Sequence, residues 1–251
     1  MAGLPTVGRR RRSGRLISVT LLSYTPNPEA TIAAAARLST SPVGAAQLRE
    51  RMGPKEIDRL LGVLLTSGHL SPFEHASFTF AIEGISRVTS HQLVRHRLAS
   101  YTQQSQRYVS MKELSYITPP SIERRPDLEA RFRDFMGQAH RFYRELMEEG
   151  VAGEDARYVL PNAAETKIVM TMNARELMQA SALRLCLRAQ WEIVNLFEHL
   201  KVAVDQVAPR IADELKPKCY ALGYCDEREN CGLMPTLADV KLVPSGGRTL
   251  S

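Results

Sequence analysis

The feature that most constrains the fold is the spacing of three β-rich segments in a chain otherwise rich in helix-forming residues. Residues 16–23, 77–82 and 166–171 combine apolar and β-branched side chains, and 77–82 alternate as a half-buried strand does. The intervening segments repeat no strand-helix-strand unit, and no glycine-rich turn of the Rossmann or P-loop kind is present. The sequence therefore predicts a single α+β domain, not a Rossmann fold, with a mixed antiparallel sheet flanked by long helices.

Helical spacing marks much of the remaining chain. Residues 29–38 are rich in alanine, Pro54 opens a leucine-patterned helix that ends at Gly68, and residues 86–96 form a further helix. A charged amphipathic helix is expected over residues 127–149, with these side chains facing inward: Leu128, Phe132, Phe135, Phe142 and Leu146.

Later in the chain, residues 154–160 predict a short helix and residues 191–216 a long one kinked at Pro209. Asn173 and Glu176 have the spacing of a capping box, which predicts a helix starting there. That helix would carry Arg184 and Arg188 on one face, where they need an anion or a carboxylate, and Glu192 could satisfy one of them.

Composition is that of an ordinary globular protein, with 44% hydrophobic and 24% charged residues in a chain of 251. No apolar run reaches the roughly 18 residues of a membrane span, and no secretory segment stands near the start, so a cytoplasmic location is expected. We divide the chain into a flexible arginine-rich segment (1–15), one domain (16–216) and a cysteine-bearing tail (217–251).

The net charge of +6 raises the possibility of a nucleic-acid-binding protein. Five of the positive charges come from arginines at positions 9, 10, 11, 12 and 15, before the first acidic residue, Glu29. Subtracting five from six leaves about +1 for the rest of the chain. A nearly neutral body argues against nucleic acid as the partner.

The four cysteines all lie late in the chain, at positions 186, 219, 225 and 231. They form no close CxxC pair and have no histidine neighbours of the kind that zinc sites use. Reduced thiols without a metal are expected, with a metal site as the alternative.

Residues 95–108 read RHRLASYTQQSQRY, which combines four basic or imidazole side chains, five hydroxyls and three amides without an acidic group. Such a run suits a planar, anionic ligand rich in heteroatoms. A solvated loop and an RNA-binding arginine tract are the alternatives. Because residues 98–106 keep no clean apolar period, we expect a ligand-facing loop there that ends near Arg107.

The spacing of this run, RHRxxSxxxxSxR, resembles the motif of the flavin-dependent thymidylate synthases, and further similarity extends from about Ala35 to Glu192. The resemblance implies an FAD-dependent methyltransferase that converts dUMP, 5,10-methylenetetrahydrofolate and NADPH to dTMP, tetrahydrofolate and NADP. Reduced flavin would donate the hydride, and no cysteine nucleophile would be needed. It also implies a homotetramer with active sites shared between subunits.

The resemblance assigns two sets of ligand-binding residues. Arg184 and Ser105 are the candidate catalytic residues, and the dUMP set is Gln92, Arg95, Gln103, Gln104, Ser105, Gln106, Arg107, Arg157 and Arg184. The FAD set is Ser39, His69, Ser71, Glu74, Arg95, His96, Arg97, Gln103, Asn173, Arg175, Gln179 and Arg188.

Some of these residues also fit roles that involve no ligand or no chemistry. Capping alone accounts for Asn173, and Ser105 can bind ligand or act as a nucleophile, although no adjacent base is evident. Tyr108 can stack on a ring or belong to the core. Gln103 and Arg188 stand where some relatives carry glutamate and histidine. A nucleotide-binding regulator without chemistry is the remaining functional alternative.

Overall fold

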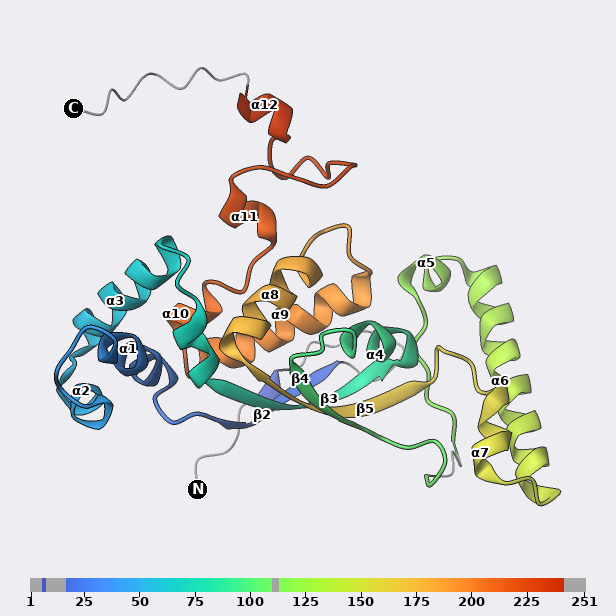
Figure 1. Cartoon of the computed structure of the whole chain (residues 1–251). Coiled ribbons are helices and arrows are strands. Elements are labelled where there is room, and N and C mark those ends of the chain that lie inside the picture. Colours follow the sequence, from blue (N-terminus) through green and yellow to red (C-terminus); the bar gives the residue numbers. More distant parts are fainter. Residues whose placement is uncertain (1–5, 8–16, 110–112, 242–251) are drawn as a thin grey trace.

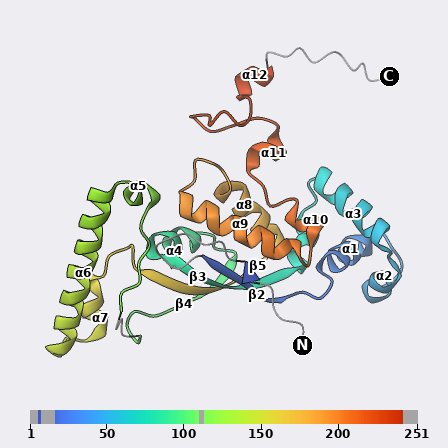
Figure 2. The same ribbon diagram turned by 180° about the vertical axis from the view of Figure 1, so that it is seen from behind.

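The computed structural model describes residues 6–7, 17–109 and 113–241, and Figures 1 and 2 show it from opposite sides. Its strands form one antiparallel sheet in the order β1-β2-β3-β5-β4. The strands are β1 (Thr6–Val7), β2 (Ser18–Tyr24), β3 (Ser77–Ser86), β4 (Ala99–Gln103) and β5 (Glu165–Asn173). The predicted α+β class is confirmed.

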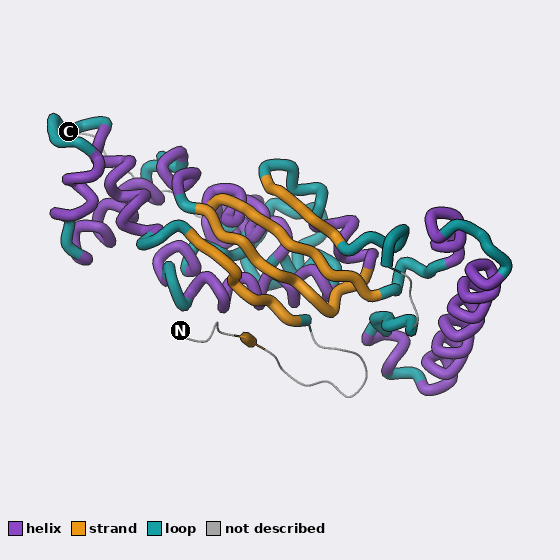
Figure 3. Tube along the Cα trace, turned by 90° about the horizontal axis from the view of Figure 1, so that it is seen from below, coloured by secondary structure: helices purple, strands orange, loops and turns teal. Residues whose placement is uncertain are grey.

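One face of the sheet forms the core. Along β3, Phe78, Phe80 and Ile82 are fully buried and alternate with partly exposed residues, as a strand covered on one face requires. Helices α8 (Ala174–Arg184) and α9 (Trp191–Asp205) cover that face, whereas the sheet viewed from the other side has no helix in front of it (Figures 1 and 3). There the hydroxyls of Thr79 and Thr171 are 2.9 Å apart across neighbouring strands.

Two helical groups lie at opposite ends of the sheet (Figures 1 and 2). The first consists of α1 (Pro28–Leu38), α2 (Ala45–Arg51), α3 (Pro54–Thr66) and the 3-10 helix η1 (Ser71–His75). The second consists of α5 (Pro120–Glu123), α6 (Pro126–Glu148), α7 (Gly153–Ala156) and the 3-10 helix η2 (Arg157–Val159). Gly68, predicted to end the helix that Pro54 opens, has a positive φ of 71° just beyond α3.

The prediction of a loop over residues 98–106 is wrong, because Ala99–Gln103 forms strand β4. This strand pairs with β5 from Ala99↔Met172 to Gln103↔Ile168. Ala99 and Tyr101 pack against the core, while Ser100 and Thr102 are exposed. The segment therefore has the two-residue period of an edge strand, carried by small and polar side chains rather than by a hydrophobic pattern.

Two helix predictions also need correction. On α6, Phe135 and Phe142 are 58% and 50% exposed, and the buried positions are Met136 and Tyr143. The predicted residues Leu128, Phe132 and Leu146 are partly buried, so the prediction fails only at Phe135 and Phe142, each one position before a buried residue. The kinked helix predicted over 191–216 is two helices, α9 and α10 (Pro209–Ala212), with Pro209 in the first turn of α10, where proline is tolerated.

Fewer residues are described at the start of the chain than in the tail. Of the predicted flexible segment 1–15, Thr6 and Val7 pair with Thr20 and Val19, and the rest lies outside the described residues, as do residues 242–251. In the tail, α11 (Lys218–Leu222) and α12 (Leu237–Lys241) are helical. Of the helices that the structure describes, none combines the length and hydrophobicity that crossing a membrane requires.

Candidate active site

Helix α4 (Arg87–Leu93) is fixed to the core at its first residues. The Ser86 hydroxyl oxygen accepts a hydrogen bond from the backbone N–H of Thr89, as an N-cap does. Glu192, at the start of α9, accepts from the Ser86 backbone N–H and hydroxyl, both at 2.6 Å. Glu192 is thus satisfied by α4, and the prediction that it neutralises an arginine of the α8 region is wrong.

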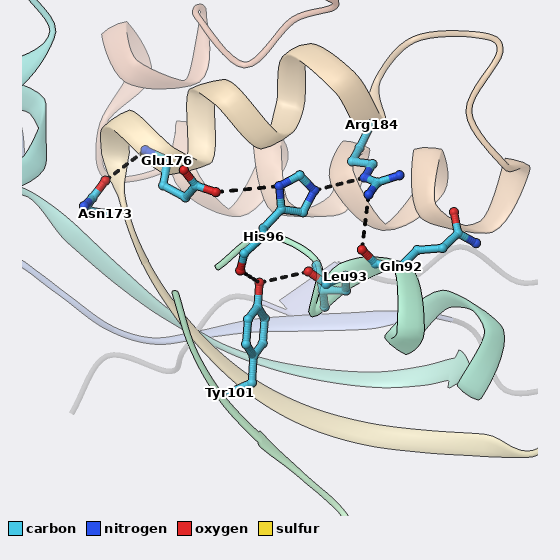
Figure 4. Close-up of polar contacts among 7 residues, drawn as sticks. All are labelled: Gln92, Leu93, His96, Tyr101, Asn173, Glu176 and Arg184. Carbon is cyan, nitrogen blue, oxygen red and sulfur yellow. Dashed lines mark hydrogen bonds and ion pairs between the residues drawn. The ribbon is translucent and has the colours of Figure 1, made fainter. Parts of the chain in front are cut away.

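His96, just after α4, lies between a carboxylate and a guanidinium (Figure 4). Arg184 Nε donates to His96 Nε2 at 2.9 Å, and Glu176 Oε1 lies 3.6 Å from His96 Nδ1. An arginine N–H can only donate, so Nε2 carries a lone pair and the ring proton is on Nδ1, facing Glu176. Burial and then the charge of Arg184 lower the pKa of His96 to about 4, which keeps the ring neutral near pH 7.

Arg184, the last residue of α8, is held by two hydrogen bonds on one side of its guanidinium. Besides the bond from Nε to His96, one terminal nitrogen donates to the Gln92 carbonyl oxygen at 3.2 Å (Figure 4). Of the five N–H donors of an arginine, three are left by these two bonds. The side chain is only partly buried, so these donors can reach a ligand while the group stays in place.

Sequence reasoning missed Tyr101 and assigned Glu176 only a capping role. The Tyr101 hydroxyl lies 2.9 Å from the carbonyl oxygens of both Leu93 and His96, so it closes the turn between α4 and β4. Burial and then the neighbouring Glu176 raise the pKa of Tyr101 to about 12, so it remains a donor. The inward alternation of β4 was the signal that could have identified Tyr101.

Most of the residues predicted to hold FAD come from three segments: η1 and the residues just before it, residues 95–97 after α4, and α8 with its N-cap. Arg175 on α8 forms an ion pair with Glu74 of η1, while Arg95, Arg97, His69 and Ser71 are exposed. The remaining members are partnered locally or exposed: Asn173 Oδ1 caps α8 at 2.9 Å from the Glu176 N–H, Ser39 donates to the Ala36 carbonyl oxygen, and Gln179 is exposed on α8.

Arg188 is not on the face of α8 where it was predicted, because α8 ends at Arg184. It lies in the following loop and pairs at 2.8 Å with Glu229 of the tail. Arg184 and Arg188 are therefore not a pair of arginines on one helix face.

A second group of predicted residues follows β4. Ser105 Oγ accepts from the backbone N–H groups of Arg107 and Tyr108, at 3.1 and 3.4 Å. Arg107 Nε lies 2.7 Å from Glu154, whose carbonyl oxygen accepts from Arg157 Nε at 3.0 Å. Tyr108 is 79% exposed beneath the Arg107 guanidinium, so it is not a core residue.

The three glutamines of the motif lie differently. Gln103 Nε2 donates to the hydroxyls of Ser90 and Thr166, at 2.8 and 3.1 Å. Gln104 is exposed and, with Gln103 and Lys167, lines a shallow groove formed by residues of β3, β5 and the end of β4, whereas Gln106 is partly buried. The amide nitrogen of Gln103 is thus already used by the protein.

The two groups of predicted residues are separated by the length of β4. His96 and Arg97 precede the strand, and Ser105 and Arg107 follow it. A strand rises about 3.4 Å per residue, so the groups are on the order of 20 Å apart. Within one chain the two groups therefore lie at opposite ends of β4.

The tail packs against the loop that follows α8. One small cavity is lined by all four cysteines, from Cys186 in that loop to Cys219, Cys225 and Cys231 in the tail. Burial and then neighbouring Cys186 raise the pKa of the Cys219 thiol. Among the described residues, no group of three or more histidine, cysteine or acidic side chains is arranged to hold a metal ion.

Comparisons with known proteins show the family of the chain. The profile of the family described as "Thymidylate synthase complementing protein" matches residues 20–210. Flavin-dependent thymidylate synthase of Geobacter sulfurreducens is 48% identical over 213 residues, which cover 84% of this chain and 91% of that protein. The enzymes of the same name from Clostridium tetani and Pyrococcus furiosus are 44% and 42% identical, covering 86% and 88% of this chain and 93% and 92% of their own.

The chain is thus of the class that the motif indicated, and it belongs to the thymidylate synthase complementing protein family, whose relatives here carry the name flavin-dependent thymidylate synthase.

Proposed function

We propose that the protein is an FAD-dependent thymidylate synthase. In this reaction dUMP, methylenetetrahydrofolate, NADPH and a proton give dTMP, tetrahydrofolate and NADP⁺. The methylene carbon is bonded to C5 of uracil and reduced to a methyl group, and the C5 hydrogen leaves as a proton. A bound flavin, once reduced by NADPH, supplies the hydride.

The observation that carries this proposal is the fixed guanidinium of Arg184. Its bonds to neutral His96 and to the Gln92 carbonyl leave three N–H donors in a partly buried setting. A fixed cation of this kind stabilises negative charge that develops on a uracil carbonyl during the reaction. We therefore assign Arg184 to the uracil of dUMP, with the Gln92 side chain and Arg95 beside it.

The residues before β4 and around α8 suit FAD by the chemistry of their donors. The exposed guanidiniums of Arg95 and Arg97, together with that of Arg175 on α8, can bind a pyrophosphate without the glycine-rich turn that this chain lacks. Hydroxyl, imidazole and amide groups add hydrogen bonds for the flavin and adenosine. We assign these hydrogen bonds to Ser39, Ser71, His69, Asn173 and Gln179, and further charged contacts to Glu74 and Arg188. His96 is assigned a contact through its ring, because Glu176 and Arg184 face its two nitrogens.

The residues after β4 suit the dUMP phosphate. Arg107 and Arg157 meet at Glu154, and the Ser105 hydroxyl stands at the head of the same turn. A dianionic phosphate would compete with Glu154 for the Arg107 guanidinium and gain donors from the turn. We assign Ser105 to binding rather than to nucleophilic attack, with Gln103, Gln104 and Gln106 lining the approach.

We also propose a homotetramer whose sites combine residues of different subunits. Support comes from the separation of the two groups along β4 and from aromatic side chains left exposed at the α6 end, namely Phe135, Phe142 and Tyr158. Large exposed aromatics are typical of interfaces. Light scattering of the purified protein checks the tetramer, and a monomer that turns over dUMP would contradict it.

Sharing of sites can be tested by mixing two inactive variants, Arg184→Ala and Arg107→Ala, after joint refolding. If each site takes one residue group from each of two subunits, a random mixture regains about a quarter of the wild-type activity. If both groups serve the same site from one chain, the mixture stays inactive.

The experiment that tests the reaction is tritium release from 5-tritiated dUMP. Release should require FAD, NADPH and methylenetetrahydrofolate together, and omission of FAD should abolish dTMP formation. A colourless protein without affinity for FAD, but with salt-dependent affinity for DNA or RNA, would favour the nucleic-acid alternative. We further propose that the protein is cytoplasmic and that no cysteine acts as a nucleophile in the reaction.

A further inference from the structure

Glu176 is a buried carboxylate that capping does not use. In a capping box the glutamate at the third helical position folds back to the backbone N–H of the N-cap residue. Here the Asn173 half of the box is formed, with Asn173 Oδ1 accepting from the Glu176 N–H, but the Glu176 side chain points to His96 instead (Figure 4). Its side chain is only 9% exposed, and burying a carboxylate is unfavourable unless a donor meets it.

The geometry points to Glu176 as a positioning residue that, through His96, holds Arg184 in the orientation needed by the nucleotide. The inference rests on the proposed function, because it takes Arg184 as a ligand of dUMP. Glu176 Oε1 faces His96 Nδ1 at 3.6 Å, and His96 Nε2 accepts from Arg184 Nε at 2.9 Å. The three side chains thus form one relay across α8 and the turn after α4.

The relay works in only one tautomer of His96. With the proton on Nδ1, the ring donates toward Glu176 and accepts from Arg184. With the proton on Nε2, a ring N–H would face an arginine N–H, and the contact would become repulsive. A carboxylate beside Nδ1 favours the first tautomer, so Glu176 determines whether the ring can hold Arg184.

The rest of the turn is held without Glu176. The Tyr101 hydroxyl bonds to the backbone carbonyls of Leu93 and His96, and Arg184 has its second bond to the Gln92 carbonyl. Loss of the Glu176 carboxylate should therefore leave the backbone of the turn in place and free only the ring. An effect of Glu176 on the orientation of Arg184 can therefore be distinguished from an effect on folding.

The test compares Glu176→Leu, which removes the acceptor, with Glu176→Gln, which keeps a neutral one. Glu192→Gln is the matched control, because it alters another buried carboxylate that holds Ser86 rather than His96. Nitrogen NMR of labelled histidine reports the His96 tautomer, calorimetry reports the Kd of dUMP, and flavin absorbance reports cofactor binding.

We expect Glu176→Leu to shift His96 toward the Nε2–H tautomer and to weaken dUMP binding roughly ten- to hundredfold, the range set by a lost hydrogen bond to a charged group. Glu176→Gln should recover most of that loss, and Glu192→Gln should lower the Tm without changing the tautomer. An unchanged tautomer in Glu176→Leu, or an equal loss of dUMP affinity in Glu192→Gln, overturns the relay. A shifted tautomer with unchanged dUMP affinity supports the relay and overturns the assignment of Arg184 to dUMP.

Discussion

The two groups of predicted ligand residues are built in opposite ways. In the group around Arg184, His96 and Glu176 are each less than 10% exposed, and the guanidinium is held by hydrogen bonds to His96 and to the Gln92 carbonyl oxygen. The group around Arg107 is open. The side chains of the ion pair between Arg107 and Glu154 are 52% and 45% exposed, and the Ser105 hydroxyl accepts hydrogen bonds from the backbone N–H groups of its own turn.

The difference suits the two arginines to different roles: Arg184 is held in place before a ligand binds, whereas Arg107 can change its partner when a ligand binds. A donor fixed before the ligand arrives acts on charge that develops in the reaction without any cost of reorganisation, which suits Arg184 to the reacting ring. An exposed ion pair contributes little to stability and is easily exchanged for a ligand, which suits Arg107 to a phosphate. Substitutions in the two groups can break this contrast, and the largest effect is expected at Arg184.

Replacing Arg184 by alanine should lower kcat/KM for dUMP about 10³-fold, because the charge on the uracil loses its fixed donor. Flavin should stay bound, since the proposed FAD donors are other residues. Steady-state kinetics and the flavin absorbance of the purified variant measure the two quantities. Loss of flavin with dUMP binding intact would reverse our assignment.

Acid should destabilise the fold through His96. Its folded-state pKa of about 4 lies below the usual 6.5, so between these values the unfolded chain binds more protons. Stability is therefore full above pH 6.5 and falls as the pH drops toward 4, by up to about 3 kcal/mol. Urea unfolding at pH 5 and pH 7 should show a smaller difference for His96→Gln than for the wild type. Equal pH dependence in the two proteins would contradict a neutral, buried His96.

Replacing Ser105 by alanine should lower dUMP affinity about tenfold and leave measurable turnover, because one hydroxyl contact to a charged phosphate is lost. Calorimetry and single-turnover kinetics separate binding from chemistry. Complete loss of turnover with dUMP affinity retained would instead support Ser105 as a nucleophile.

The smallest effect on catalysis is expected from the tail. Joint replacement of Cys219, Cys225 and Cys231 by serine should change kcat by less than about twofold, because Arg184 is held by residues outside the tail. The Tm should fall, since these side chains line the cavity between the tail and the loop after α8. A large loss of kcat in a folded variant would assign the tail a direct part in the site.

Sequence by itself determined the local features of this protein. Asn173 caps a helix, Pro54 and Gly68 bound another, and the RHR segment marks the family, because caps, prolines and motif spacing act over a few residues. It failed where a weak pattern had to be resolved by packing: β4 is a strand because β5 pairs with it, and α6 exposes Phe135.

Tertiary structure alone decided how the site is assembled. Glu192 meets Ser86, Glu176 meets His96, and Arg188 meets Glu229, although none of these pairs is local in sequence. For Glu192 and Glu176, the partners are decided by the crossing of α4, α8 and α9, because a buried carboxylate needs donors to satisfy it. The exposed pair of Arg188 and Glu229 is decided by the packing of the tail against the loop after α8.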